Sequence, residues 1–216
     1  MMASQPETLV AERVRSLEVR WILPGPLEDP VTGWFARFPA GVEAREDIYL
    51  VAPPLRGLSV KLRRGRALEV KEYQGSRGIL EVAGCARGRL EAWDKWSFSG
   101  GPPGRGGAEL PGWRPVRKLI RRFSPMSGRG GARVRGRGED LGCQVELTEV
   151  LVRGQAWWTL GFEATGPPGL LRTELEATAA LVFAQALPGG IELGTVDSRS
   201  YAQWLAGGPA DHAASA

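Results

Sequence analysis

The chain has 216 residues, 43% of them hydrophobic, which is enough for one sizeable buried core and predicts one domain. Its formal net charge is +4, and this basic balance favours anionic partners in general without choosing among them. The one histidine, His212, lies in a small-residue C-terminal segment. A Ser-His-Asp or Cys-His catalytic site and a histidine-based metal centre are therefore excluded.

No run of 18 apolar residues occurs, so we expect no membrane partner. The first residues lack the apolar stretch of an export signal. Cys85 and Cys143 stand in unrelated surroundings and have the character of reduced, packed thiols. These features together predict a cytoplasmic protein.

Alternation of apolar and polar residues dominates the chain, beginning with Leu17, Val19 and Trp21 against Glu18 and Arg20. A period of two predicts strands with one apolar face, which favours antiparallel pairing. Strands are predicted at residues 16–23, 46–51, 58–63, 67–73, 78–82, 89–98, 113–123, 142–151 and 156–163. Helical spacing predicts a short helix at 29–38 and a longer one at 168–187. A barrel and a two-layer sheet with helices both agree with this order.

The domain organisation follows from composition. Residues 15–205 are expected to form one domain, after a flexible or helical lead-in at 1–14. Two glycine- and arginine-rich loops, 99–112 and 127–138, have too little apolar surface to offset ordering entropy. Residues 206–216 are expected to be a disordered tail.

Paired charges lie on the polar faces of several predicted strands. They are Glu18 with Arg20, Lys61 with Arg63, and Glu69 with Lys71. Such faces either meet solvent or line the inside of a closed barrel. All four lysines of this arginine-rich chain fall in predicted strands, which indicates a positional need for a compact ammonium charge; they are Lys61, Lys71, Lys95 and Lys118.

The predicted strands resemble, in order, those of the CYTH or triphosphate tunnel metalloenzyme superfamily. The first, from Ser16 to Arg20, is similar to the Glu-x-Glu-x-Lys strand that opens this family. The other similar segments are 47–50, 58–63, 68–71, 145–147, 161–163 and 200–205. The resemblance therefore spans most of the chain and rests on the order of the segments.

The resemblance implies an α+β fold: a closed or strongly curved antiparallel β-barrel (tunnel) of about eight strands, with helices packed outside. It implies that basic side chains in the tunnel bind a small phosphorylated anion such as triphosphate; we expect these to be Arg20, Lys61, Arg63, Lys71, Lys118 and Arg122. It also implies carboxylates that bind Mg²⁺ or Mn²⁺, for which the candidates are Glu18, Glu146 and Glu163. A metal-activated water would then attack a phosphoryl group.

The chain departs from the family pattern at four positions. Ser16 and Arg20 replace a metal-binding Glu and a Lys, Ser59 replaces an Arg, and Glu69 adds a negative charge beside Lys71. Three functions consequently stay open. They are a metal-dependent triphosphate phosphohydrolase, a non-catalytic anion-binding protein, and a basic nucleic-acid-associated protein that uses the loop at 127–138.

Overall fold

The computed structural model describes residues 11–52, 57–64, 67–82, 84–98, 111–125 and 142–207. The loop at 127–138, nearly all of the loop at 99–112, and the tail from residue 208 lie outside the described residues. At both ends of the domain the predicted boundaries were too narrow. Residues 11–14 are strand rather than a flexible or helical lead-in, and residues 206–207 belong to a helix rather than to a disordered tail.

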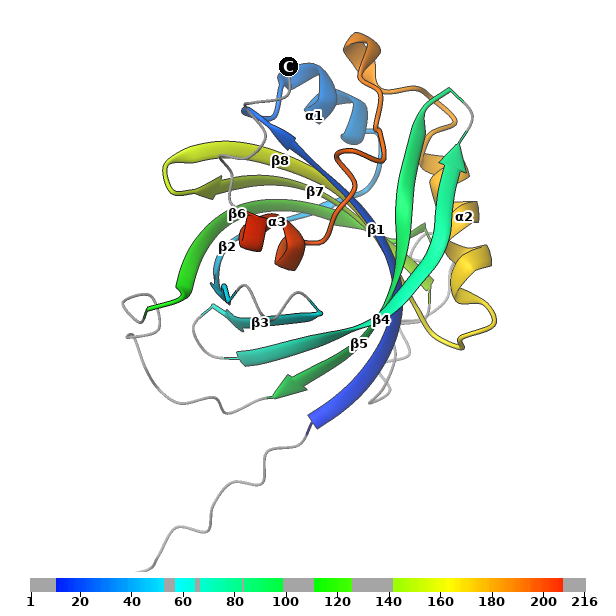
Figure 1. The fold of residues 1–216 in the computed structure, drawn as a ribbon. Helices are drawn as coiled ribbons and strands as arrows, with labels where there is room; N and C mark the ends of the chain where they lie inside the picture. Colours follow the sequence, from blue (N-terminus) through cyan, green and yellow to red (C-terminus); the bar gives the residue numbers. More distant parts are fainter. Residues whose placement is uncertain are drawn as a thin grey trace, which may run out of the picture.

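Eight antiparallel strands close into a barrel with the order β1-β5-β4-β3-β2-β6-β7-β8, as the fold class predicted (Figure 1). The bounds are β1 Ala11–Pro24, β2 Gly41–Leu50, β3 Leu58–Arg63, β4 Ala67–Val82, β5 Ala86–Phe98, β6 Trp113–Phe123, β7 Gly142–Val152 and β8 Gln155–Thr165. Closure leaves no free sheet edge among these strands, because β8 pairs with β1 from Ser16↔Thr165 to Pro24↔Trp157.

The prediction of two strands at 67–73 and 78–82 was wrong, because both belong to the single strand β4. Its register with β5 shifts between Tyr73 and Gly75 and again between Ser76 and Ile79. Gly75 and Gly78 have positive φ values of 109° and 89°, which glycine adopts without the steric cost that other residues meet. These irregularities bend the strand without ending it.

The alternation of β1 separates two environments across the barrel wall. Leu17, Val19 and Trp21 are buried in the outer core, which lies between the barrel and two helices. Glu18 and Arg20 face the inside of the barrel, where they line a pocket. The apolar side of the alternation is therefore outside and the charged side is inside.

Helices α1 (Asp29–Phe35) and α2 (Leu171–Val182) pack outside the barrel, as predicted (Figure 1). Both are shorter than the predicted ranges. After α1, Phe38 leaves the helix and its ring stacks on Phe123 with centroids 4.3 Å apart. After α2, Phe183 packs edge-on against Trp21 in the outer core. Both aromatic rings therefore pack on the outer core just beyond the helix ends.

A third helix, α3 (Tyr201–Gly207), covers one end of the barrel. Its Trp204 and Leu205 pack with an inner cluster of inward-facing apolar side chains: Ile22, Tyr49, Val116, Val150, Val152 and Trp157. The sequence analysis assigned no helix here. In the part of the chain that the structure describes, no helix combines the length and apolar character needed to cross a membrane.

We predict that Leu175→Asp lowers the free energy of unfolding by about 3 kcal/mol or more, because it places a charge in the seam between α2 and the barrel. Leu175 is fully buried, whereas Leu181 of the same helix is 51% exposed. Leu181→Asp is the matched control, and urea unfolding monitored by circular dichroism compares the two variants. Equal stabilities would contradict the packing of α2.

Candidate functional site: a charged lumen

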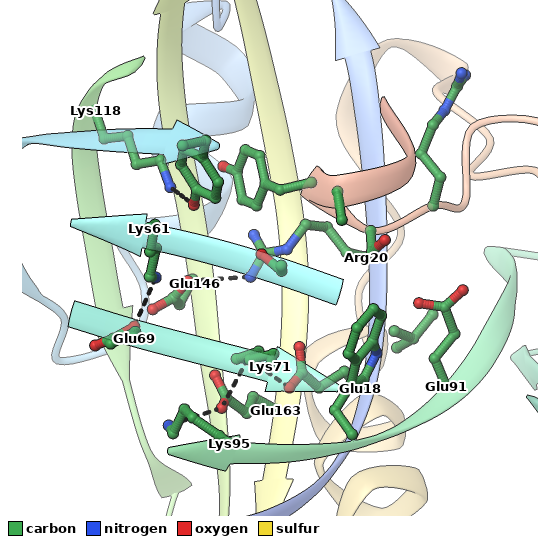
Figure 2. A pocket seen from close by; sticks show the side chains of 18 of the residues that line it. Glu18, Arg20, Lys61, Glu69, Lys71, Glu91, Lys95, Lys118, Glu146 and Glu163 are labelled. Atoms are coloured by element: carbon green, nitrogen blue, oxygen red, sulfur yellow. Dashed lines mark hydrogen bonds and ion pairs between the residues drawn. The ribbon is translucent and has the colours of Figure 1, made fainter. Parts of the chain in front are cut away.

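A pocket inside the barrel is lined by charged side chains from all eight strands and by the segment that leads into α3 (Figure 2). The charged side chains that line it are Glu18, Arg20, Arg45, Lys61, Arg63, Glu69, Lys71, Arg89, Glu91, Lys95, Lys118, Glu146, Glu163 and Arg199. Charged side chains are rarely buried unless they are paired. The arrangement of the pairs therefore decides what the lumen can bind.

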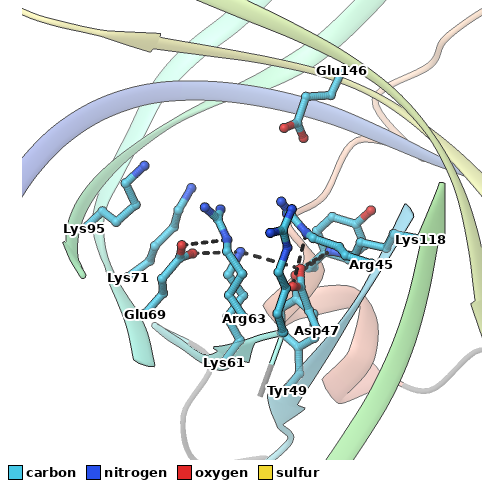
Figure 3. Close-up of polar contacts among 12 residues, drawn as sticks. Arg45, Asp47, Tyr49, Lys61, Arg63, Glu69, Lys71, Lys95, Lys118 and Glu146 are labelled. Carbon is cyan, nitrogen blue, oxygen red and sulfur yellow. Dashed lines mark hydrogen bonds and ion pairs between the residues drawn. The ribbon is translucent and has the colours of Figure 1, made fainter. Parts of the chain in front are cut away.

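Asp47 on β2 is the centre of one set of ion pairs (Figure 3). Its side chain is 0% exposed and lies 3.2 Å from Arg45 Nε, 3.2 Å from Lys118 Nζ and 3.9 Å from Lys61 Nζ. Burial alone would raise the pKa of Asp47, but attraction to Lys118, Lys61 and Arg45 outweighs burial and lowers it. One buried carboxylate thus positions three cations.

Glu69 on β4 extends this set across β3 (Figure 3). One of its oxygens lies 2.9 Å from Lys61 Nζ and the other lies 2.8 Å from Arg63 Nε. Glu69 is nearly fully buried, whereas the Arg63 side chain is 36% exposed. The carboxylates therefore lie deeper than the cations that they orient. We call these six residues the basic wall: Arg45, Asp47, Lys61, Arg63, Glu69 and Lys118.

Lys118 lies where the basic wall meets the inner cluster. Its Nζ donates a hydrogen bond of 2.7 Å to Tyr49 Oη and lies 3.9 Å from the ring centroid of Tyr201. Burial lowers the pKa of Lys118, and the nearby Tyr49 and Asp47 oppose that shift only in part. The two tyrosines place a cation–π cage around the ammonium at the end covered by α3.

The opposite side of the lumen has its carboxylates on β7, β8 and β1, which are neighbours in the barrel. Glu18 and Glu163 are paired across β1 and β8, and both contact Lys71 Nζ, at 2.6 Å and 3.3 Å. Lys95 Nζ lies 3.2 Å from the same Glu163 oxygen. Two carboxylates and two ammonium groups therefore form a closed cluster, which we call the Lys71 cluster.

Glu146 on β7 is engaged separately, by two arginines. Arg20 donates to one of its oxygens at 3.2 Å and Arg122 donates to the other at 2.7 Å. Burial favours protonation of Glu146, but Arg20 and Arg122 outweigh it and lower its pKa to about 2. Gly161 lies between Arg20 and Glu146 in the barrel register. A Cβ atom there would lie 2.6 Å from the Arg20 guanidinium carbon, so only glycine leaves room for this contact.

The structure bears out the predicted common interior for Glu18, Arg20, Lys61, Arg63 and Lys71. It also brings Lys118 to the same lumen. Arg122 does not line the pocket; it contacts Glu146, which does. The roles of these residues in binding an anion stay predictions.

The three predicted metal ligands do not converge. Glu18 and Glu163 meet at Lys71, whereas Glu146 lies between its two arginines. Within the described ranges of the chain, no three Asp, Glu, His or Cys side chains lie close enough together to bind a metal ion. Ser16, which the family resemblance aligns with a metal-binding Glu, donates a hydrogen bond of 2.5 Å to Glu18.

Several lumen residues were missed as site candidates. Arg45, Asp47 and Tyr49 alternate along β2 and therefore face the same side of the sheet. The predicted strand at 46–51 began too late to include Arg45. Lys95 was noted only for its place in a strand. Glu91 gave no sequence signal; burial raises its pKa, and it accepts a hydrogen bond of 3.0 Å from Gln203 of α3. The link between α3 and the lumen therefore depends on tertiary structure.

Comparisons with known proteins name no family. No family model matches the chain, and no curated protein matches it. Among solved structures, the chain is similar to a conserved hypothetical protein from Pyrococcus furiosus, with 14% identity, a TM-score of 0.42, and coverage of 86% of this chain and 98% of that one. It is also similar to the PH1819 protein of Pyrococcus horikoshii, with 16% identity, a TM-score of 0.44, and coverage of 86% and 97%.

The lowered pKa of Glu146 predicts a pH dependence. The ionised Glu146 stabilises the fold fully above its usual pKa of 4.5, and this stabilisation is lost as the pH falls toward about 2. The pKa difference corresponds to about 3 kcal/mol of unfolding free energy. We expect Glu146→Gln to flatten the fall in unfolding free energy over this range, measured by urea unfolding. Glu149→Gln, which removes a carboxylate on the same strand, is the control. If the unfolding free energy of Glu146→Gln fell with pH as steeply as that of the wild type, the pairing of Glu146 with its two arginines would be contradicted.

Gly161→Ala tests the contact between Arg20 and Glu146 by its effect on stability. The added methyl group displaces the guanidinium from the buried carboxylate, so we expect a loss of about 1–3 kcal/mol in unfolding free energy. Gly41→Ala on β2 is the matched control, because a Cβ atom there meets nothing within 4 Å. Equal losses in the two variants would contradict a specific need for glycine at position 161.

Proposed function

We propose that this protein binds a phosphorylated polyanion, such as a triphosphate, inside its barrel. The observation that supports this is the charge imbalance of the basic wall. Four cations, Arg45, Lys61, Arg63 and Lys118, share two carboxylates, Asp47 and Glu69. Arg45 also lies 3.3 Å from Glu43, but Glu43 is shared with Arg64 and Arg122, so positive charge is left over on this wall.

The carboxylates of the basic wall also favour binding through preorganisation. Because Asp47 and Glu69 fix the cations from below, a ligand does not have to order four long side chains when it binds. Charge-assisted hydrogen bonds from ammonium and guanidinium groups to phosphate are the strong class of such bonds. The low effective dielectric of a small, mostly enclosed lumen strengthens them further.

A polyanion matches this geometry better than a single phosphate. The cations come from β3, β2 and β6, which are neighbours in the barrel, so the excess of positive charge extends across three strands. A chain of phosphoryl groups presents negative charge over a comparable length. The ligand therefore gains several contacts at once, each with a different strand.

Isothermal titration of tripolyphosphate into the wild type and into Lys61→Ala/Lys71→Ala tests the proposal. We expect the double variant to bind at least ~10-fold more weakly, because it loses the Lys61 contact and leaves Glu18 and Glu163 without the ammonium that lies between them. The control is Arg87→Ala/Arg117→Ala, which removes the same charge from side chains that are 64% and 75% exposed. Its affinity should stay close to that of the wild type.

Three further outcomes discriminate among the functions. Equal affinity of the two double variants would contradict a site in the lumen. Release of phosphate with Mg²⁺ or Mn²⁺ would identify a phosphohydrolase. Binding of RNA that is lost when residues 127–138 are deleted, with the fold retained, would favour the nucleic-acid-associated alternative.

A further inference from the structure

Lys71 occupies the position between two carboxylates that a bound cation would otherwise take (Figure 2). Its Nζ lies 2.6 Å from Glu18 Oε1 and 3.3 Å from Glu163 Oε1, and these two residues are direct partners across β1 and β8. Lys95 adds a second ammonium at 3.2 Å from the same Glu163 oxygen. The charges of the Lys71 cluster therefore balance within the protein.

A divalent metal does not fit this cluster. Mg²⁺ and Mn²⁺ require oxygen ligands, and proteins supply them chiefly as carboxylates. Only Glu18 and Glu163 converge here, because Ser16 offers a neutral hydroxyl and Glu146 is engaged by Arg20 and Arg122. A metal would also have to displace the Lys71 ammonium against its attraction to both carboxylates.

The ammonium is not easily lost by deprotonation either. Burial alone would lower the pKa of Lys71, but the attraction of Glu163 and Glu18 outweighs burial and raises it. The contacts of Lys71 with both carboxylates therefore favour the charged ammonium between them.

We infer that Lys71 takes the charge-balancing place of a divalent metal in this barrel, so that the lumen binds its phosphorylated polyanion in the free, metal-uncomplexed form. This inference rests on the proposed function for its ligand. It differs from the expectation drawn from the family resemblance, in which carboxylates recruit Mg²⁺ or Mn²⁺.

The state of the Lys71 cluster determines how magnesium affects binding of the polyanion. Mg²⁺ complexed to a polyphosphate cancels part of its negative charge and occupies oxygens that the basic wall would contact. In a site with free carboxylates, bonds between the metal and those carboxylates would offset the lost contacts between the polyphosphate and the basic wall. Here Glu18 and Glu163 are already neutralised by Lys71 and Lys95, so magnesium should weaken binding.

The first experiment measures metal binding without any polyanion. Mn²⁺ is titrated into the wild-type chain of 216 residues, and free Mn²⁺ is read from its electron paramagnetic resonance signal. We expect no binding by the wild type at submillimolar Mn²⁺, detectable binding by Lys71→Met, and tighter binding by Ser16→Glu/Lys71→Met. Adding Glu163→Gln to Lys71→Met should abolish the gain, and circular dichroism melting verifies that each variant folds.

Lys118→Met is the matched control, because it removes a buried ammonium that contacts neither Glu18 nor Glu163. It should bind no Mn²⁺. Submillimolar Mn²⁺ binding by the wild type would overturn the inference. Failure of folded Lys71→Met and Ser16→Glu/Lys71→Met to gain binding would also overturn it, because the ammonium would then not be what excludes the metal.

The second experiment titrates tripolyphosphate into the wild type in excess EDTA and in excess Mg²⁺. We expect binding in EDTA and at least ~3-fold weaker binding in Mg²⁺. Binding that requires Mg²⁺ would support the proposed function and overturn this inference. Absence of binding in both buffers would contradict the proposed function, whereas the Mn²⁺ titration would still decide the metal question.

Discussion

Charge burial is the constraint on which this structure depends. A closed barrel of eight strands directs every second side chain inward, and in this chain the side chains that line the pocket inside it are mostly acidic or basic. An unpaired buried charge costs several kcal/mol, so the fold is stable only if the inward charges meet partners across strands. The ion pairs of Asp47, Glu69, Glu146 and Lys71 meet this requirement, each joining at least two strands.

The pairing is uneven around the barrel, and this unevenness gives the lumen its chemical character. In the basic wall, buried Asp47 and Glu69 are outnumbered by the cations that they orient. In the Lys71 cluster, the charges balance. The same interactions that allow the barrel to fold therefore create one surface that attracts anions and another that has no vacancy for a metal.

The two hydrophobic clusters have different places and different roles: one packs the domain together and the other borders the charged pocket. The outer core, between the barrel and α1 and α2, is apolar and carries the packing of the domain. The inner cluster covers one end of the lumen through Trp204 and Leu205 of α3. Because Tyr201 at the start of α3 contacts Lys118 and Arg20, the position of this helix and the shape of the charged pocket are coupled.

The sequence by itself determined most of the strands and their two faces, because a period of two is a local property of the chain, although it divided β4 in two and began β2 too late. It also determined that Glu18, Arg20, Lys61, Arg63 and Lys71 share one face. Only the tertiary structure decided that this face is the inside of a barrel, that Glu146 pairs with arginines while Glu18 and Glu163 meet at Lys71, and that α3 covers the lumen. Partner choice among inward charges depends on register and closure between strands distant in sequence, and single-strand alternation does not contain that information.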